Sequence, residues 1–174
     1  MRILITTIVF LIVSSIKAQQ FPYLEGELLS NEKIELPKDC KTKYSLIGLG
    51  YSQKAEEELR TWYDPSIDKF ILKRGMFDSE YDVNIYFIPM FHGLTKVSYD
   101  KSFKKVKQLT DERLYKHVLF YKGEIKSYKE SLSLSDKEKP VFFLVDPEGN
   151  IVLRFEGKYK ESYFEQVVEW IDAH

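Results

Sequence analysis

The sequence is poor in the residues that carry redox and metal chemistry. It has one cysteine, Cys40, among 174 residues. A single cysteine cannot form an internal disulfide or a Cys-x-x-Cys pair, and it excludes a zinc site built from several thiolates. The three histidines, His92, His117 and His174, lie far apart and show no metal-ligand spacing. We therefore expect neither a metal nor a bound cofactor.

Neither sign of charge dominates the chain. The formal net charge of −1 becomes −3 when Arg2 and Lys17 are left out with the N-terminal segment discussed next. Basic residues gather only in "KSFKKVKQ", residues 101–108, which we interpret as the solvated face of a helix. A nucleic-acid-binding protein would carry a basic stripe, so we expect no nucleic acid partner.

The one long apolar run lies at the N-terminus. "MRILITTIVFLIVSSIKA", residues 1–18, combines the basic Arg2, an apolar-to-small stretch and the small residue Ala18. This pattern is typical of a secretory signal, whereas a membrane-spanning helix needs about 20 apolar residues. We predict a signal peptide over residues 1–18 and one exported domain over residues 19–174, either periplasmic or extracellular. The bulky Ile16 and the adjacent Lys17 leave an uncleaved N-terminal anchor as an alternative.

Strand and helix patterns alternate through the first half of this domain. "EGELL" and "EKIEL", joined by "SN", predict a small hairpin, and residues 43–51 predict a buried strand. A helix should begin after Ser52 as N-cap, with its apolar face packed inward. Asp64 and Pro65 predict either a kink or a restart capped by Asp64, and Gly75 should end the helix.

The second half continues with a strand that we expect Pro89 to end. A helix should cover residues 98–115, with Thr110 capping a second turn, and "HVLFYKGE" should form a strand. Residues 127–138 read as a polar loop. Residues 140–157 predict a hairpin around "DPEGN", and "KESYFEQVVEWIDA" predicts the last helix. We place Trp62 and Trp170 in the core, since both lie on apolar helix faces.

This order of elements resembles the thioredoxin superfamily, in the redoxin version with an N-terminal hairpin. The most specific stretch is "KPVFFLVDPEGNIVLRFEGKY", residues 139–159, a hairpin preceded by a proline. The resemblance implies an α/β, three-layer sandwich with a mixed central sheet and flanking helices. It also implies a cis bond between Lys139 and Pro140. The sequence departs from the superfamily in lacking the Cys-x-x-Cys, so we expect no redox pair.

Two further stretches, "LIGLGYSQKAEEELRTWYDP" and "YFIPMFHG", are similar to the mitochondrial ATP synthase assembly factors and their bacterial relatives. Those proteins have a redoxin-like fold without the paired cysteines. The similarity implies a chaperone or assembly role without redox turnover, which an exported protein would exert on the outer side of a membrane.

In the thioredoxin-like fold, the loops after parallel strands meet at one edge of the sheet, where ligands bind. The residues that we expect there are Tyr51, Ser52, Gln53, Pro89, Met90, Phe91, His92 and Pro140. Met90 and Phe91 form either an exposed hydrophobic contact site or part of the core. A Ser52–His92 catalytic pair is a weaker alternative, because no acid partner can be assigned and N-capping explains the serine.

Cys40 is the weak candidate for catalysis. It should lie at the opposite end of its strand from the edge just described, and Lys38, Lys41 and Lys43 could lower its pKa. Our main hypothesis is an exported, redox-inactive, thioredoxin-like protein that binds a polypeptide client near a membrane. The alternatives are a single-cysteine thiol peroxidase or thiol transferase using Cys40, and a structural domain paired through Cys40.

Overall fold

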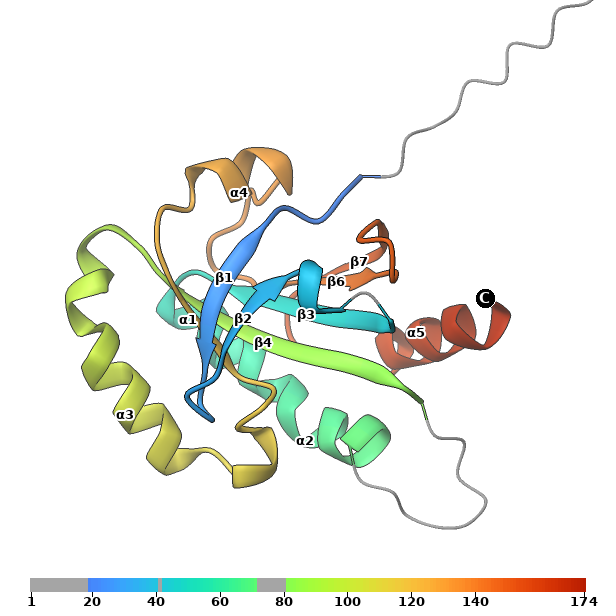
Figure 1. The fold of residues 1–174 in the computed structure, drawn as a ribbon, viewed down its shortest axis with the longest axis horizontal. Coiled ribbons are helices and arrows are strands. Elements are labelled where there is room, and N and C mark those ends of the chain that lie inside the picture. The colour runs from blue at the N-terminus through green and yellow to red at the C-terminus, as the bar shows by residue number, and fades with distance from the viewer. Residues whose placement is uncertain (1–18, 41, 72–80) are drawn as a thin grey trace, which may run out of the picture.

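The computed structural model describes residues 19–40, 42–71 and 81–174, which form a seven-stranded mixed sheet between two helical layers (Figure 1). The strand order is β2-β1-β5-β4-β3-β6-β7, and β3 is parallel to β4 but antiparallel to β6. The strands are β1 (Leu24–Leu28), β2 (Lys33–Leu36), β3 (Tyr44–Gly50), β4 (Val83–Phe91), β5 (Leu119–Lys122), β6 (Val141–Val145) and β7 (Ile151–Glu156).

The helices cover both faces of this sheet. They are α1 (Gln53–Leu59), α2 (Tyr63–Ser66), α3 (Tyr99–Leu109), α4 (Lys126–Ser131) and α5 (Glu161–Ala173). Side chains of α1, α3 and α5 share one core cluster with one face of the sheet, including Leu59, Val106 and Phe164. On the other face, Tyr128 of α4 joins a second cluster with the N-terminal hairpin. The predicted three-layer sandwich is confirmed.

The hairpin predicted at the start of the domain is β1 and β2, and β2 is an outer strand of the sheet. The N–H of Glu35 in β2 donates to Asp39 Oδ2 at 2.7 Å. Asp39 belongs to a short 3₁₀ turn, Lys38–Cys40, that follows Pro37. This carboxylate therefore satisfies a main-chain donor that an edge strand would otherwise present to solvent.

The helix after β3 changes type along its length, as Asp64 and Pro65 predict. A 3₁₀ turn, Arg60–Trp62, separates α1 from α2, and a π-helical turn, Ile67–Ile71, follows. Pro65 lies in the first turn of α2, where its missing N–H removes no helical hydrogen bond. The predicted cap at Asp64 is wrong, because Asp64 lies inside α2 and the N-cap of α2 is Trp62. The predicted end at Gly75 lies outside the described residues.

Three other predictions are wrong in detail. Pro89 does not end β4, which runs on to Phe91, because Pro89 lies where the partner of β4 changes from β3 to β5. Asp111 rather than Thr110 caps the turn after α3, through a hydrogen bond from the Arg113 N–H (2.9 Å). The stretch read as a polar loop contains α4, which packs Tyr128 against the sheet.

Trp62 is the centre of the core on the α1 and α5 side. Its indole is fully buried and stacks on Phe142 of β6, with ring centroids 3.7 Å apart. Its Nε1 donates to the carbonyl oxygen of Gly157, beyond β7, at 3.1 Å. Gly48 of β3 lies beneath Phe142, and a Cβ there would come within 2.3 Å of that ring. The predicted core position of Trp62 is confirmed, while Trp170 is only partly buried.

We expect Trp62→Ala to lower the free energy of unfolding by about 3–5 kcal/mol, because it leaves a large cavity and an unpaired Gly157 carbonyl. Urea unfolding followed by circular dichroism measures this difference. Trp170→Ala is the matched control, since Trp170 is partly exposed and should cost less. Equal losses in the two variants would contradict a central role for Trp62.

Candidate functional site

The predicted meeting of strand ends is present in the structure. The parallel strands β3 and β4 end at the same edge, where Tyr51 and Ser52 follow β3 and His92 follows β4. His92 Nε2 lies 3.1 Å from the carbonyl oxygen of Tyr51, so this nitrogen carries the proton and donates it. We call this region the strand-end edge.

At the strand-end edge, Ser52 joins α1 to a loop from a distant part of the chain. Its Oγ accepts a hydrogen bond from the N–H of Ala55 (3.1 Å), which confirms the predicted N-cap. The same hydroxyl donates to the carbonyl oxygen of Lys137 at 2.5 Å. Since His92 is bonded to Tyr51 instead, the structure does not form the Ser52–His92 pair.

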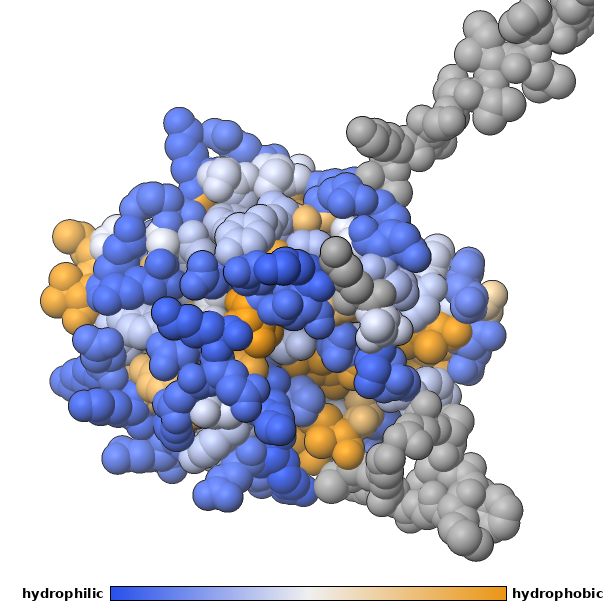
Figure 2. Space-filling view, viewed as in Figure 1, coloured by the Kyte–Doolittle hydropathy of each residue, from blue (hydrophilic) through white to orange (hydrophobic). Residues whose placement is uncertain are grey.

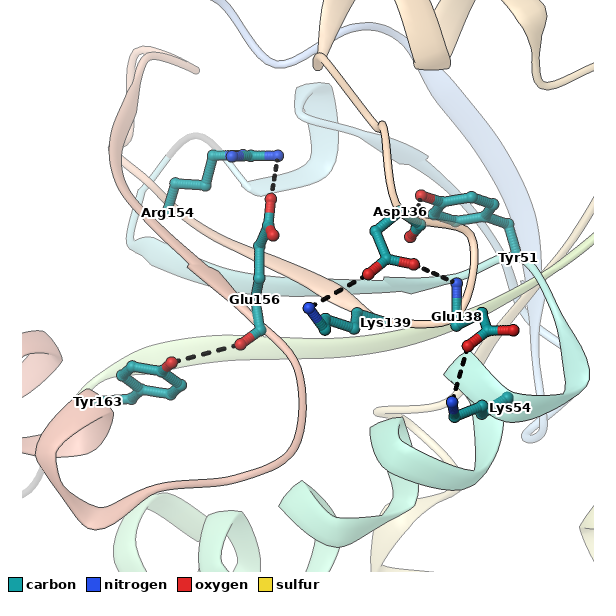
Figure 3. A network of polar contacts seen from close by, with 8 residues as sticks. All are labelled: Tyr51, Lys54, Asp136, Glu138, Lys139, Arg154, Glu156 and Tyr163. Carbon is teal, nitrogen blue, oxygen red and sulfur yellow. Dashed lines mark hydrogen bonds and ion pairs between the residues drawn. The ribbon is translucent and has the colours of Figure 1, made fainter.

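The loop that reaches Ser52 is residues 136–139, and it is fixed at several points (Figure 3). The Tyr51 hydroxyl donates to the carbonyl oxygen of Asp136 (2.7 Å), and Lys54 Nζ lies 2.7 Å from Glu138 Oε2. Within the loop, Asp136 accepts from the N–H of Glu138 (2.9 Å) and pairs with Lys139 (3.2 Å). The 136–139 loop therefore covers the start of α1 with the chain's own polar groups.

These contacts shift the ionisation of the loop's acids. The pKa of Asp136 is lowered, first by the hydrogen bond from the Glu138 N–H and then by Lys139. The pKa of Glu138 is lowered by its hydrogen bond to Lys54, and that of Lys54 is raised by the same contact. All three groups are exposed, so each pair contributes little to stability on its own.

The cis bond expected between Lys139 and Pro140 is not present. Among the described residues the cis peptide bond is Leu36–Pro37, beside the 3₁₀ turn that precedes β3. Pro140 is buried, its carbonyl oxygen accepts from the Gly157 N–H (2.9 Å), and the 136–139 loop before it turns toward Ser52. The bond at Pro140 is trans, and the chain on either side of it is held by the Gly157 and Ser52 contacts.

Met90 and Phe91 are core residues. They are 2% and 5% exposed, because β4 continues through them and pairs with β5. The exposed contact site considered for these two side chains is therefore wrong, and the core alternative holds. Pro89 and Tyr51 are buried as well. Of the eight residues predicted for binding, Ser52, Gln53 and His92 keep appreciable exposure.

Cys40 lies in the turn before β3, at the opposite end from the strand-end edge, as predicted. Its side chain is 2% exposed, and burial raises the pKa of its thiol. Hydrogen bonds with Ser45 and Tyr86 lower that pKa only in part, and of the predicted lysines neither Lys38 nor Lys43 contributes, while Lys41 lies outside the described residues. The expected net lowering of this pKa is wrong, because desolvation of the buried thiol dominates and raises it. The structure gives no support to Cys40 as a nucleophile or as an intermolecular disulfide partner.

A groove of about 480 Å³ opens on another side of the sheet, beside the hairpin. Its lining comes from β1, β2, β5, the start of α3 and α4, and most of its apolar part is aromatic: Tyr23, Tyr99, Phe120, Tyr121 and Tyr128. We call it the tyrosine groove. This groove was not predicted from the sequence, although Glu25 and Glu27 alternate along β1 and Tyr23 immediately precedes that strand, so the three fall on one face.

The described residues offer no metal centre. No three acidic, histidine or cysteine side chains among them gather in the way that a metal ion requires. Within that part of the chain, too, no helix has the length and apolarity needed to cross a membrane.

Comparison with solved structures identifies the architecture. The thioredoxin domain of a thiol-disulfide oxidoreductase from Bacteroides vulgatus aligns over 90% of this chain and 99% of its own, with 20% identity and a TM-score of 0.57. The copper-bound ScoI of Arabidopsis thaliana aligns over 90% and 100%, with 19% identity and a TM-score of 0.57. The fold is thioredoxin-like.

A third similar structure is the exposed lipoprotein thioredoxin Etrx1 of Streptococcus pneumoniae, with 16% identity over 85% of this chain and 98% of its own, at a TM-score of 0.56. No family model matches the sequence, and no curated protein matches it. At these identities the likeness shows the thioredoxin-like fold alone. The chain differs from a dithiol enzyme at the start of α1, where Ser52 and Gln53 provide no thiol.

We expect the protein to reduce no insulin disulfides and to consume no peroxide above the buffer rate. Its one thiol is buried, with a raised pKa, and so provides almost no thiolate at neutral pH. In the native protein Cys40 should also react with a thiol reagent much more slowly than in urea. Activity that disappears in Cys40→Ser, or rapid labelling of the native protein, would contradict this prediction.

Glu56 of α1 is the acid whose ionisation should be visible in stability. Burial raises the pKa of its carboxyl to about 7, while Arg60 lowers it in part. The folded protein therefore binds a proton that the unfolded chain has lost, and stability falls as pH rises from about 4.5 to 7.

Glu56→Gln should remove this slope and raise the free energy of unfolding at pH 8 by about 1–3 kcal/mol. Urea titrations between pH 5 and pH 8 measure both effects, with the exposed neighbour Glu57→Gln as control. A wild-type stability that rises over this range because of Glu56 would contradict the assignment.

Proposed function

We propose that this is an exported, redox-inactive, thioredoxin-like protein that binds an extended polypeptide in the tyrosine groove, as an assembly or chaperone-type factor. One observation carries the proposal. The strand-end edge is covered by the protein's own 136–139 loop, whereas the tyrosine groove is open and lined by aromatic rings.

The groove is held in shape by contacts within the chain. The Tyr128 hydroxyl donates to the carbonyl oxygen of Tyr23 at 2.7 Å, which fixes the chain at the start of β1. The rings of Tyr121 and Tyr128 meet edge to face, with centroids 5.3 Å apart. Tyr23 stays 56% exposed, so one ring face is available for contact. Tyrosine is enriched in protein interfaces because it offers a large apolar surface at low entropic cost.

Charged groups of both signs surround these rings. Glu25 and Glu27 come from β1, and Lys33 and Lys122 come from β2 and β5. Lys122 Nζ lies 5.0 Å from the centre of the Tyr99 ring, so one cation is already held there. A balanced rim suits a polypeptide, which presents both hydrogen-bond donors and acceptors, better than a ligand of one strong charge.

The absence of a thiol at the strand-end edge supports binding without turnover. A serine hydroxyl at a helix start is not ionised by the helix dipole alone and needs a base, which His92 does not provide here. Export is supported by the signal-like residues 1–18. A client would then meet the protein outside the cytoplasm.

Binding to an array of short, unrelated peptides tests the proposal. We expect the protein to bind a subset of them, and Tyr23→Ala to weaken that binding about tenfold or more, as a truncated aromatic anchor does. The exposed ring makes this substitution structurally mild. Gln53→Ala, at the strand-end edge, is the control and should bind as the wild type does.

Two results would overturn the proposal. If the protein bound none of the peptides, the proposal of a polypeptide client would be wrong. If Gln53→Ala lost binding while Tyr23→Ala bound as the wild type does, the peptide would bind at the strand-end edge and not in the tyrosine groove.

A further inference from the structure

The segment from Gly93 to Leu109 has an outer face that nothing in the fold explains. It comprises a 3₁₀ turn, Gly93–Ser98, and α3. Leu94 and Val97 are 94% and 91% exposed, the two most exposed large apolar side chains of the described residues. Figure 2 shows an apolar area at the left edge of the molecule, where Figure 1 places the turn that leads into α3.

Lysines continue this face along α3. The segment contains five lysines, one aspartate and no arginine, in a chain whose net charge is −1. Lys101, Lys104 and Lys105 are exposed, and in the described part of the structure none of the three forms an ion pair. Lys101 follows Val97 by four residues, and Lys104 and Lys105 follow Lys101 by three and four, so the three lysines lie on one side of α3 that continues from Val97. The opposite side packs Tyr99 and Val106 into the core.

The composition of this face is unlike that of a protein interface. Interfaces between proteins are depleted in lysine and take their binding energy from tyrosine, tryptophan and arginine in pockets. Here the aromatic residues of the segment, Tyr99 and Phe103, face inward, and the outward apolar groups protrude instead of lining a pocket. Protruding aliphatic side chains beside unpaired lysines are typical of segments that lie on an anionic lipid surface.

We propose that the outer face of the Gly93–Leu109 segment docks on an anionic membrane surface. The side chains of Leu94 and Val97 enter the headgroup layer, and Lys101, Lys104 and Lys105 contact lipid phosphates. Tyr99 lines the tyrosine groove from the inner side of the same helix, so docking leaves that groove open. The inference does not depend on a polypeptide occupying the groove.

A fluorescent probe at position 97 tests the docking locally. In a Cys40→Ser background, Val97→Cys places a single thiol at an exposed position, which is labelled with an environment-sensitive dye. We expect a blue shift with phosphatidylglycerol-containing vesicles but not with pure phosphatidylcholine vesicles, and a weaker shift at high salt. A dye at the exposed Glu148, in the turn between β6 and β7, should not respond.

Charge reversal separates this face from the charge of the whole protein. Lys101→Glu, Lys104→Glu and Lys105→Glu together should weaken partitioning to anionic vesicles about a hundredfold, since each lysine near such a surface contributes about fivefold. The control triple variant, Lys126→Glu, Lys137→Glu and Lys158→Glu, changes the net charge equally at exposed positions elsewhere. Leu94→Ser should weaken partitioning about tenfold with all lysines present.

Three outcomes would overturn the proposal. The first is no shift of the position-97 probe with anionic vesicles. The second is equal loss in the two triple variants. The third is a shift with soluble polyglutamate but not with vesicles, which would make the partner an acidic polypeptide.

Discussion

The stacking of Trp62 on Phe142 is the interaction on which the arrangement of the layers depends. It joins the helix after β3 to the antiparallel part of the sheet, and the indole hydrogen bond to Gly157 ties in the chain beyond β7. Gly48 allows Phe142 to lie directly over the central strand. Trp62 belongs to the 3₁₀ turn Arg60–Trp62, so the helix changes type at the residue that forms this contact.

The start of α1 is a position that can hold a reactive side chain, but in this protein its residues make structural contacts. A helix start presents unpaired N–H groups that can stabilise a thiolate. Here the Ser52 hydroxyl oxygen accepts a hydrogen bond from one of these N–H groups, that of Ala55. The same hydroxyl donates its hydrogen to the carbonyl oxygen of Lys137. The result is a joint between α1 and the loop before β6, with Tyr51 and Lys54 adding contacts to Asp136 and Glu138.

Much of the fold could be predicted because its local signals agree with its global packing. The hairpin, the Ser52 cap, the helix break at Pro65 and the last hairpin were all visible in short patterns. The errors arose where tertiary partners decide the outcome. Pro89 lies inside a strand because its neighbours change there, and no local pattern before Pro140 distinguishes a trans from a cis bond. The tyrosine groove draws residues from five separate elements, so no single stretch of sequence could reveal it.

The hydrogen bond between the Glu35 N–H and Asp39 has a consequence for the protein in a crowded compartment. A sheet with an open outer strand can recruit a second chain by main-chain pairing. With Asp39 in place, β2 offers one donor fewer to an incoming strand, and the neighbouring Lys38–Glu35 pair places charge at the same spot. The geometry therefore disfavours the pairing of another strand at this point of β2.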